Sequence, residues 1–167
     1  NSIDALKAFV TEKAIGLFRT YEVLSEKELH SRYEIYVDTY AKQINIEARV
    51  AIDMVKKQIL PAGLEYATFL ADSISSFQAV SVRASVQEDL IKKLGALLSS
   101  TYKNLARLEE ALTAAQGISD CSRQAEAYRD KVFPAIQTLR TDIDGIEMLM
   151  PSDMWPIPTY VDLLFKL

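Results

Sequence analysis

The sequence predicts an all-α fold: an antiparallel bundle of three to four long helices, followed by a short C-terminal docking helix. Apolar residues recur at the spacing of one helix face, and no stretch shows strand-like alternation bounded by turn pairs. Only five glycines and five prolines interrupt 167 residues, so long elements are expected. We expect a single helical domain with an N-terminal helix in 1–20, the bundle in 25–150 and a proline- and aromatic-rich tail in 151–167.

Composition disfavours several partners and locations. The net charge of −4 and the pI near 5.1 disfavour nucleic acid, whose binding needs many Lys or Arg contacts to phosphate. No window approaches the roughly 18 consecutive apolar residues that cross a membrane. Cys121 is the single cysteine and the N-terminus has no signal pattern, which indicates a cytoplasmic protein. The opening Asn1-Ser2 without a methionine predicts an excised domain of a larger protein.

The first two helical stretches differ in how clearly they are bounded. Residues 3–20 form one amphipathic pattern, which either packs on the bundle or belongs to upstream structure. The next helix has a capping box from Ser25 to Glu28, in which hydroxyl and carboxylate each bond the other residue's amide. Its apolar face is formed by Tyr33, Val37, Tyr40, Ile44, Ala48, Ala51, Val55 and Ile59.

Pro61 raises the question of where that helix ends. Helix-favouring residues continue to about Phe77, so we expect one long helix kinked at Pro61, because proline lacks the amide donor and crowds the preceding turn. A break at residues 61–63 is the alternative.

Two further helices are predicted to form an antiparallel pair. A second capping box at Ser85 and a left-handed Gly117 bound a helix near 86–116. Its partner is 120–150, with an irregularity at Pro134. The first helix carries a coiled-coil seam at Ile91, Leu94, Leu98, Thr101, Leu105, Leu108 and Leu112. The second offers Ala125, Tyr128, Val132, Ile136, Leu139, Ile143, Ile146 and Met150.

The sequence gives little support for a catalytic or metal-binding site. A di-iron bundle needs two Glu-x-x-His motifs and zinc needs three or four ligands, whereas the chain has one histidine, His30, and one cysteine. Phosphate-binding glycine loops are absent from the sequence. Cys121 falls in the first turn of a predicted helix, where its thiolate could be favoured, but a small residue at a helix start is the simpler interpretation. We expect no catalytic, cofactor-binding or metal-binding residue in this chain.

Two clusters suggest contacts with other domains or subunits. The run 28–36 mixes charges with tyrosines, which fits either a tyrosine-rich core or an interdomain contact. The run 153–160 combines two prolines with aromatics, and Thr159 can cap a last short helix. The candidate contact residues are Arg32, Tyr33, Tyr36, Trp155, Pro156, Pro158, Tyr160 and Phe165.

These runs resemble the C-terminal region of type III glutamine synthetases. The resemblance covers the chain from about residue 14 onward and is carried, in order, by residues 23–36, 44–48, 58–62, 128–134 and 153–165. It implies a parent enzyme that joins ammonia to glutamate at the expense of ATP, with Mg²⁺ or Mn²⁺, in a large ring-built oligomer. The family's catalytic residues lie in the upstream domain, so the resemblance implies a structural role here, with the catalytic domain and neighbouring subunits as partners.

Two other functions compete with this one. An independent helical interaction or sensor module would bury both chain ends, whereas an excised appendage would leave residues 3–20 or 155–165 exposed. A small helical enzyme would need a polar pocket around His30 or Cys121.

Overall fold

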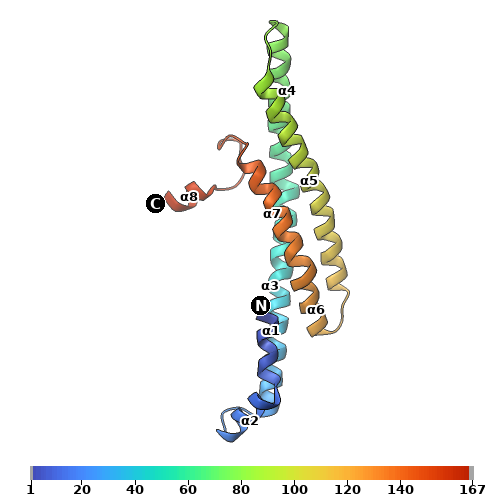
Figure 1. The fold of residues 1–167 in the computed structure, drawn as a ribbon, viewed down its shortest axis with the longest axis vertical. Helices are drawn as coiled ribbons and strands as arrows, with labels where there is room; N and C mark the ends of the chain where they lie inside the picture. Colours follow the sequence, from blue (N-terminus) through green and yellow to red (C-terminus); the bar gives the residue numbers. More distant parts are fainter. Residues whose placement is uncertain (1, 166–167) are drawn as a thin grey trace. The chain divides into compact units, whose positions relative to one another are not determined.

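The computed structural model describes residues 2–165, apart from the side chains of Ser2 and Tyr160. It is 83% helical and this described region contains no strand, which confirms the all-α prediction. Three long helical segments dominate, at residues 26–79, 85–116 and 121–147 (Figure 1). The elements are α1 (Ser2–Leu6), η1 (Lys7–Val10), α2 (Glu12–Thr20), α3 (Glu26–Met54), η2 (Val55–Ile59), α4 (Leu60–Ala79), α5 (Ser85–Gln116), α6 (Cys121–Ala127), η3 (Tyr128–Val132), α7 (Phe133–Glu147) and α8 (Tyr160–Phe165).

The chain forms two compact units. Unit 1 comprises Asn1–Arg49 and Glu110–Pro134, and unit 2 comprises Val50–Glu109 and Ala135–Leu167. Each unit therefore combines segments that lie far apart in the sequence. That the chain forms a single domain stays a prediction.

The N-terminal segment of unit 1 is divided into three short helices, so the expectation of one helix over residues 3–20 is wrong. Thr11 is extended, with φ −78° and ψ 149°, and its hydroxyl accepts a hydrogen bond from the amide of Ala14. Threonine at this position caps α2, because it satisfies an amide that has no partner within the helix. A cap cannot also continue the preceding helical turn, which is why the amphipathic pattern is interrupted there.

The capping box before α3 is confirmed. The Glu28 carboxylate accepts from the amide of Ser25 at 2.7 Å, and the amide of Glu28 donates to the Ser25 hydroxyl at 3.3 Å. The hydrogen bonds that the amide and the hydroxyl of Ser25 donate to this carboxylate lower the pKa of Glu28. The expected stripe along α3 is also found, with Val37 1%, Ile44 6% and Ala48 0% exposed.

The helix continues through Pro61 by means of a π-helical turn. In η2, directly before the proline, the amide of Leu60 donates to the carbonyl of Val55, five residues back. Lys57, whose carbonyl would meet the proline ring in a regular α-helix, lies within this widened turn. The alternative of a helix break is therefore not what the structure shows.

Pro134 is accommodated in the same way. The π-helical turn η3 precedes it, and the amide of Phe133 donates to the carbonyl of Tyr128. The predicted irregularity at Pro134 is confirmed, and it takes the form of one widened turn within a helical segment that runs from Cys121 to Glu147.

In unit 2, α4 and α5 run side by side in opposite directions (Figure 1). Lys56 of η2, directly before α4, forms an ion pair with Glu109 of α5. At the turn, Ser81 has φ 59°, and the amide of Val82 donates to the carbonyl of Phe77 at 3.0 Å. This is the Schellman pattern that ends many helices, here with serine in the left-handed position that glycine usually fills.

The start of α5 differs from the prediction by one residue. The amide of Glu88 donates to the carbonyl of Ala84 at 2.9 Å, so Ala84 accepts the first helical hydrogen bond and Ser85 is already helical. The capping box expected at Ser85 is therefore wrong.

The part of the predicted α5 seam from Leu94 to Leu108 lies in unit 2 and is buried. Leu94 is 0%, Leu98 8% and Leu105 2% exposed. A small polar network interrupts this apolar core: Asn104 and Ser100 both donate to the Asp142 carboxylate of α7, at 2.7 and 2.9 Å. Because the polar atoms pair with one another, the network fixes the register of α5 against α7 without leaving a buried group unsatisfied.

At the end of α5, in unit 1, the expected left-handed cap at Gly117 is wrong. The helix ends at Gln116 as predicted, but no described glycine has a positive φ, so Gly117 does not supply a left-handed cap. Instead the side-chain amide of Gln124 donates to the carbonyls of Ala115 and Ile118, at 3.3 and 3.0 Å. A side chain from the following helix thus satisfies the end of α5.

Candidate interaction surfaces

The predicted cluster on α3 is largely used within unit 1. The Tyr33 hydroxyl lies 3.4 Å from the Ser122 hydroxyl of α6. The Tyr36 ring meets Phe9 edge to face, with centroids 6.2 Å apart, while 46% of Tyr36 stays exposed. Arg32 is exposed. Arg32 and nearly half of Tyr36 are therefore exposed, whereas Tyr33 is half-buried.

An ion-pair cluster that the sequence analysis missed fastens α1 to η3 in unit 1. The Arg129 guanidinium donates to Asp4 at 2.9 Å and, through two nitrogens, to Asp130 at 2.6 and 2.8 Å. The guanidinium lowers the pKa of Asp130, and the two carboxylates raise the pKa of Arg129 further. Lys7 and Glu126 add a second pair at 2.8 Å.

A second polar cluster in unit 1 joins three helical segments. The Asn45 side-chain oxygen of α3 accepts from Gln116 of α5 at 2.8 Å and from the Tyr128 hydroxyl of η3 at 3.2 Å. Tyr128 is 3% exposed, and burial raises the pKa of its hydroxyl. Asn45 and Tyr128 both fall in runs that carry the family resemblance, but their pairing is not visible in the sequence.

His30 and Cys121 line the same open, polar hollow of unit 1. No hydrogen bond joins them in the described part of the chain. Burial raises the pKa of the Cys121 thiol, and so do the carboxylates of Asp38, Asp120 and Glu34. The structure therefore does not support a favoured thiolate at this helix start, because burial and the three acids raise the pKa of the thiol. This geometry gives little support to nucleophilic catalysis.

The C-terminal tail of unit 2 divides into a buried and an exposed part. Trp155 is 7% exposed, and its indole nitrogen has no hydrogen-bond partner among residues 2–165. Pro156 and Pro158 are exposed, and Phe165 is 77% exposed. The side chain of Tyr160 lies outside the described residues.

The predicted cap of the last helix is confirmed. The Thr159 hydroxyl donates to the Asp162 carboxylate at 2.9 Å, and the Asp162 amide donates back to the hydroxyl at 3.2 Å. The helix that follows exposes most of its apolar side chains: Val161 is 66%, Leu163 68% and Leu164 73% exposed. A capped helix of this composition presents an apolar surface.

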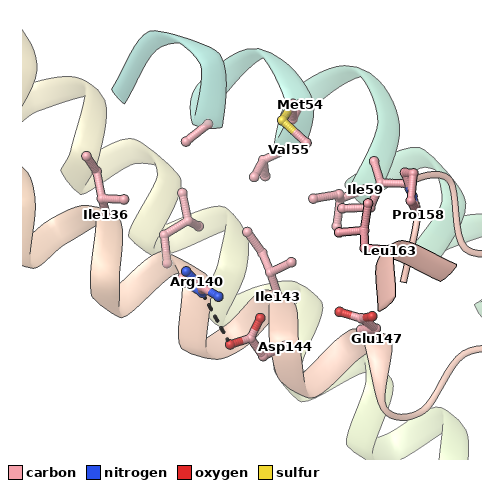
Figure 2. A pocket seen from close by; sticks show the side chains of 13 residues that line it. Met54, Val55, Ile59, Ile136, Arg140, Ile143, Asp144, Glu147, Pro158 and Leu163 are labelled. Atoms are coloured by element: carbon pink, nitrogen blue, oxygen red, sulfur yellow. Dashed lines mark ion pairs between the residues drawn. The ribbon is translucent and has the colours of Figure 1, made fainter. Parts of the chain in front are cut away.

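Unit 2 also contains an apolar cavity of about 370 Å³. Figure 2 shows three walls: Met54, Val55 and Ile59 from α3 and η2, side chains of α7, and Pro158 with Leu163 from the tail. The α7 wall consists of Ile136, Leu139, Arg140, Ile143, Asp144 and Glu147. On this wall Arg140 pairs with Asp144 at 3.6 Å.

The described residues contain neither a candidate metal site nor a candidate membrane span. No group of three or more His, Cys, Asp or Glu side chains in this part of the chain is placed to hold a metal ion. None of its helices is long and apolar enough to span a bilayer.

Comparison with known proteins supports the resemblance to glutamine synthetases. Residues 1–78 match the family model described as the glutamine synthetase C-terminal domain. The predicted resemblance is confirmed. The chain is 25% identical to a glutamine synthetase of Bacteroides fragilis and 27% identical to a type-3 glutamine synthetase of Dictyostelium discoideum. Each match covers 97% of this chain but only 23% of the relative.

A glutamine synthetase of Butyrivibrio fibrisolvens is similar to the same extent, with 26% identity over 98% of this chain and 24% of the relative. The chain thus spans about a quarter of the length of these glutamine synthetases. It corresponds to their C-terminal part.

Proposed function

We propose that this chain is the non-catalytic C-terminal helical domain of a type III glutamine synthetase. The parent enzyme would join ammonia to glutamate at the expense of ATP, with Mg²⁺ or Mn²⁺ and all catalytic residues in its upstream domain, in the cytoplasm. The similarity of nearly the whole chain to the C-terminal quarter of glutamine synthetases supports this proposal.

The role of the domain is structural: it packs on the catalytic domain of its own chain or on neighbouring subunits of a homo-oligomer. The observation that carries this role is the surface of α8, where Leu163, Leu164 and Phe165 are 68–77% exposed. An apolar face on a helix that is capped by Thr159 favours association, because covering it removes apolar area from water. Pro156, Pro158 and Arg32 are exposed and extend the proposed contacts.

The N-terminal end supports a second candidate, an independent interaction module. Ile3 is 1% exposed, and two ion pairs fasten its segment within unit 1. The segment around Ile3 therefore has packing partners within its own unit, whereas the exposed surface of α8 favours the enzyme appendage.

The test uses the full-length parent with Leu164→Asp, compared with Val86→Asp. Val86 is a matched control, because it is 67% exposed on α5 whereas Leu164 is 73% exposed on α8. Assembly mass is measured by light scattering and glutamine synthesis by product formation. We expect the α8 variant to lose assembly or activity and the control to retain both.

Three outcomes have separate meanings. Equal behaviour of the two variants would contradict the role of α8. A full-length protein that makes no glutamine would overturn the family-based proposal, and the independent module would take its place. Loss of assembly with retained synthesis in isolated subunits would confine the role to subunit contacts.

A further inference from the structure

The apolar cavity of unit 2 carries charged side chains on one wall. Its walls are formed by apolar side chains such as Val55, Ile59 and Ile143, and the charges come from a single helix, α7. The residues of α3, η2 and the tail that line it are all uncharged. Figure 2 shows Arg140, Asp144 and Glu147 spaced along the α7 wall.

The three charges differ in what they are already paired with. Asp144 pairs with Arg140 at 3.6 Å, and about half of each side chain is exposed. Glu147 is half-buried and has no ion-pair or hydrogen-bond partner in the part of the chain that the structure describes. Burial, followed by the charge of Asp144, raises its pKa. The cavity therefore carries one net negative charge that lacks a counterion.

The backbone at the end of α7 also favours a positive charge near Glu147. Glu147 is the last residue of α7, and the last turn of that helix contains no basic residue. The carbonyl end of a helix carries a partial negative charge and is usually complemented by a cation. Carboxylate and helix end both favour a positive group at the same place.

We propose that this cavity binds a small molecule with an apolar body and a single positively charged end. The apolar body lies between Ile59 of η2 and Ile143 of α7, and the charged end lies at Glu147. The ligand is a small molecule rather than a partner helix, because Pro158 and Leu163 of the chain's own tail form the third wall. The volume of about 370 Å³ is near the lower end of the range of small-molecule sites, about 300–1,000 Å³.

This site shares Leu163 with the proposed assembly surface, but neither proposal rests on the other. A cation of the right length would exchange its hydration for the carboxylate and the helix end, and its apolar body would leave water. A carboxylic acid of the same length would face Glu147 with a like charge. An alcohol would keep the apolar contacts alone.

The experiment is calorimetric titration of the 167-residue chain with hexylammonium, hexanol and hexanoate. Circular dichroism and a cooperative thermal transition first establish that each protein sample is folded. We expect hexylammonium to bind about tenfold tighter than hexanol, and hexanoate to bind more weakly than either. The preference for the cation should be lost in Glu147→Gln and retained in Glu65→Gln, an exposed acid on α4 of the same unit.

A second variant tests the place of the apolar body. Ala51 lines the cavity and is half-buried, so Ala51→Leu should fill it and abolish binding of both the amine and the alcohol. Equal affinity for the three probes, no binding to the folded protein, or an unchanged cation preference in Glu147→Gln would each overturn the proposal. Binding that persists in Ala51→Leu would place the probes elsewhere, such as on α8, and would also overturn it.

Discussion

Replacing Gly63 by alanine tests how closely α4 approaches α5 in unit 2. A Cβ atom added to Gly63 would lie 2.6 Å from Cδ2 of Leu98, whereas one added to Gly95 meets nothing within 4 Å. Both glycines lie inside helices, where alanine is more favourable by about 1 kcal/mol. Gly95→Ala should therefore stabilise the protein by about 1 kcal/mol.

Gly63→Ala should not realise that gain. Leu98 is 8% exposed, so its side chain has little room to turn away, and overpacking of this kind costs about 1–3 kcal/mol. The net effect ranges from near neutral to a loss of about 2 kcal/mol, and the two alanine variants should differ by about 1–3 kcal/mol. Urea unfolding followed by circular dichroism measures both free energies of unfolding.

The pair Gly63→Ala and Leu98→Ala adds a double-mutant test. Leu98→Ala alone should cost about 2–5 kcal/mol, because it leaves a cavity in the core. In the Gly63→Ala background the cost should be smaller by about 1 kcal/mol or more, since the new methyl group fills part of the vacated space. Equal stabilisation by both glycine substitutions, together with additive double-mutant energies, would refute the close approach of these two helices.

Three further predictions rest on local features. Ser25→Ala should destabilise the protein by about 1 kcal/mol in urea unfolding. Since the pKa of Glu28 is lowered in the folded state, the contribution of this cap is present above the unfolded pKa and is lost as pH falls through the folded value, so the variant and the parent should converge in acid. Ser81→Gly should raise stability by about 1 kcal/mol, because φ of 59° strains serine. Cys121 should react with iodoacetamide more slowly at pH 8 than a free thiol, and an equal rate would contradict its raised pKa.

Local and periodic features could be predicted from the sequence. The capping boxes at Ser25 and Thr159 need only residues three positions apart, and the buried seam of α5 follows from its repeating leucines. Local reasoning was not always sufficient, because the capping box expected at Ser85 did not form and Ala84 accepts the first helical hydrogen bond there.

Features that depend on distant residues could not be predicted. Arg129 pairs with Asp4 across 125 residues, and Gln124 occupies the role that local reasoning assigned to Gly117. Pro61 lacks an amide donor, which predicts a disturbance of the helix. The missing donor does not tell whether the helix breaks or widens into a π turn. The cavity is assembled from three segments, so no single pattern indicates it.

The buried indole of Trp155 has a spectroscopic consequence. Since it is the only tryptophan of the chain, fluorescence excited selectively in indole reports on the tail alone. A ring that is 7% exposed and has an unpaired Nε1–H should emit at short wavelength. If the catalytic domain supplies an acceptor to that N–H, the emission should move to longer wavelength while acrylamide still fails to quench it. Release of the tail into water would give the same shift together with strong quenching, so one residue distinguishes a docked tail from a detached one.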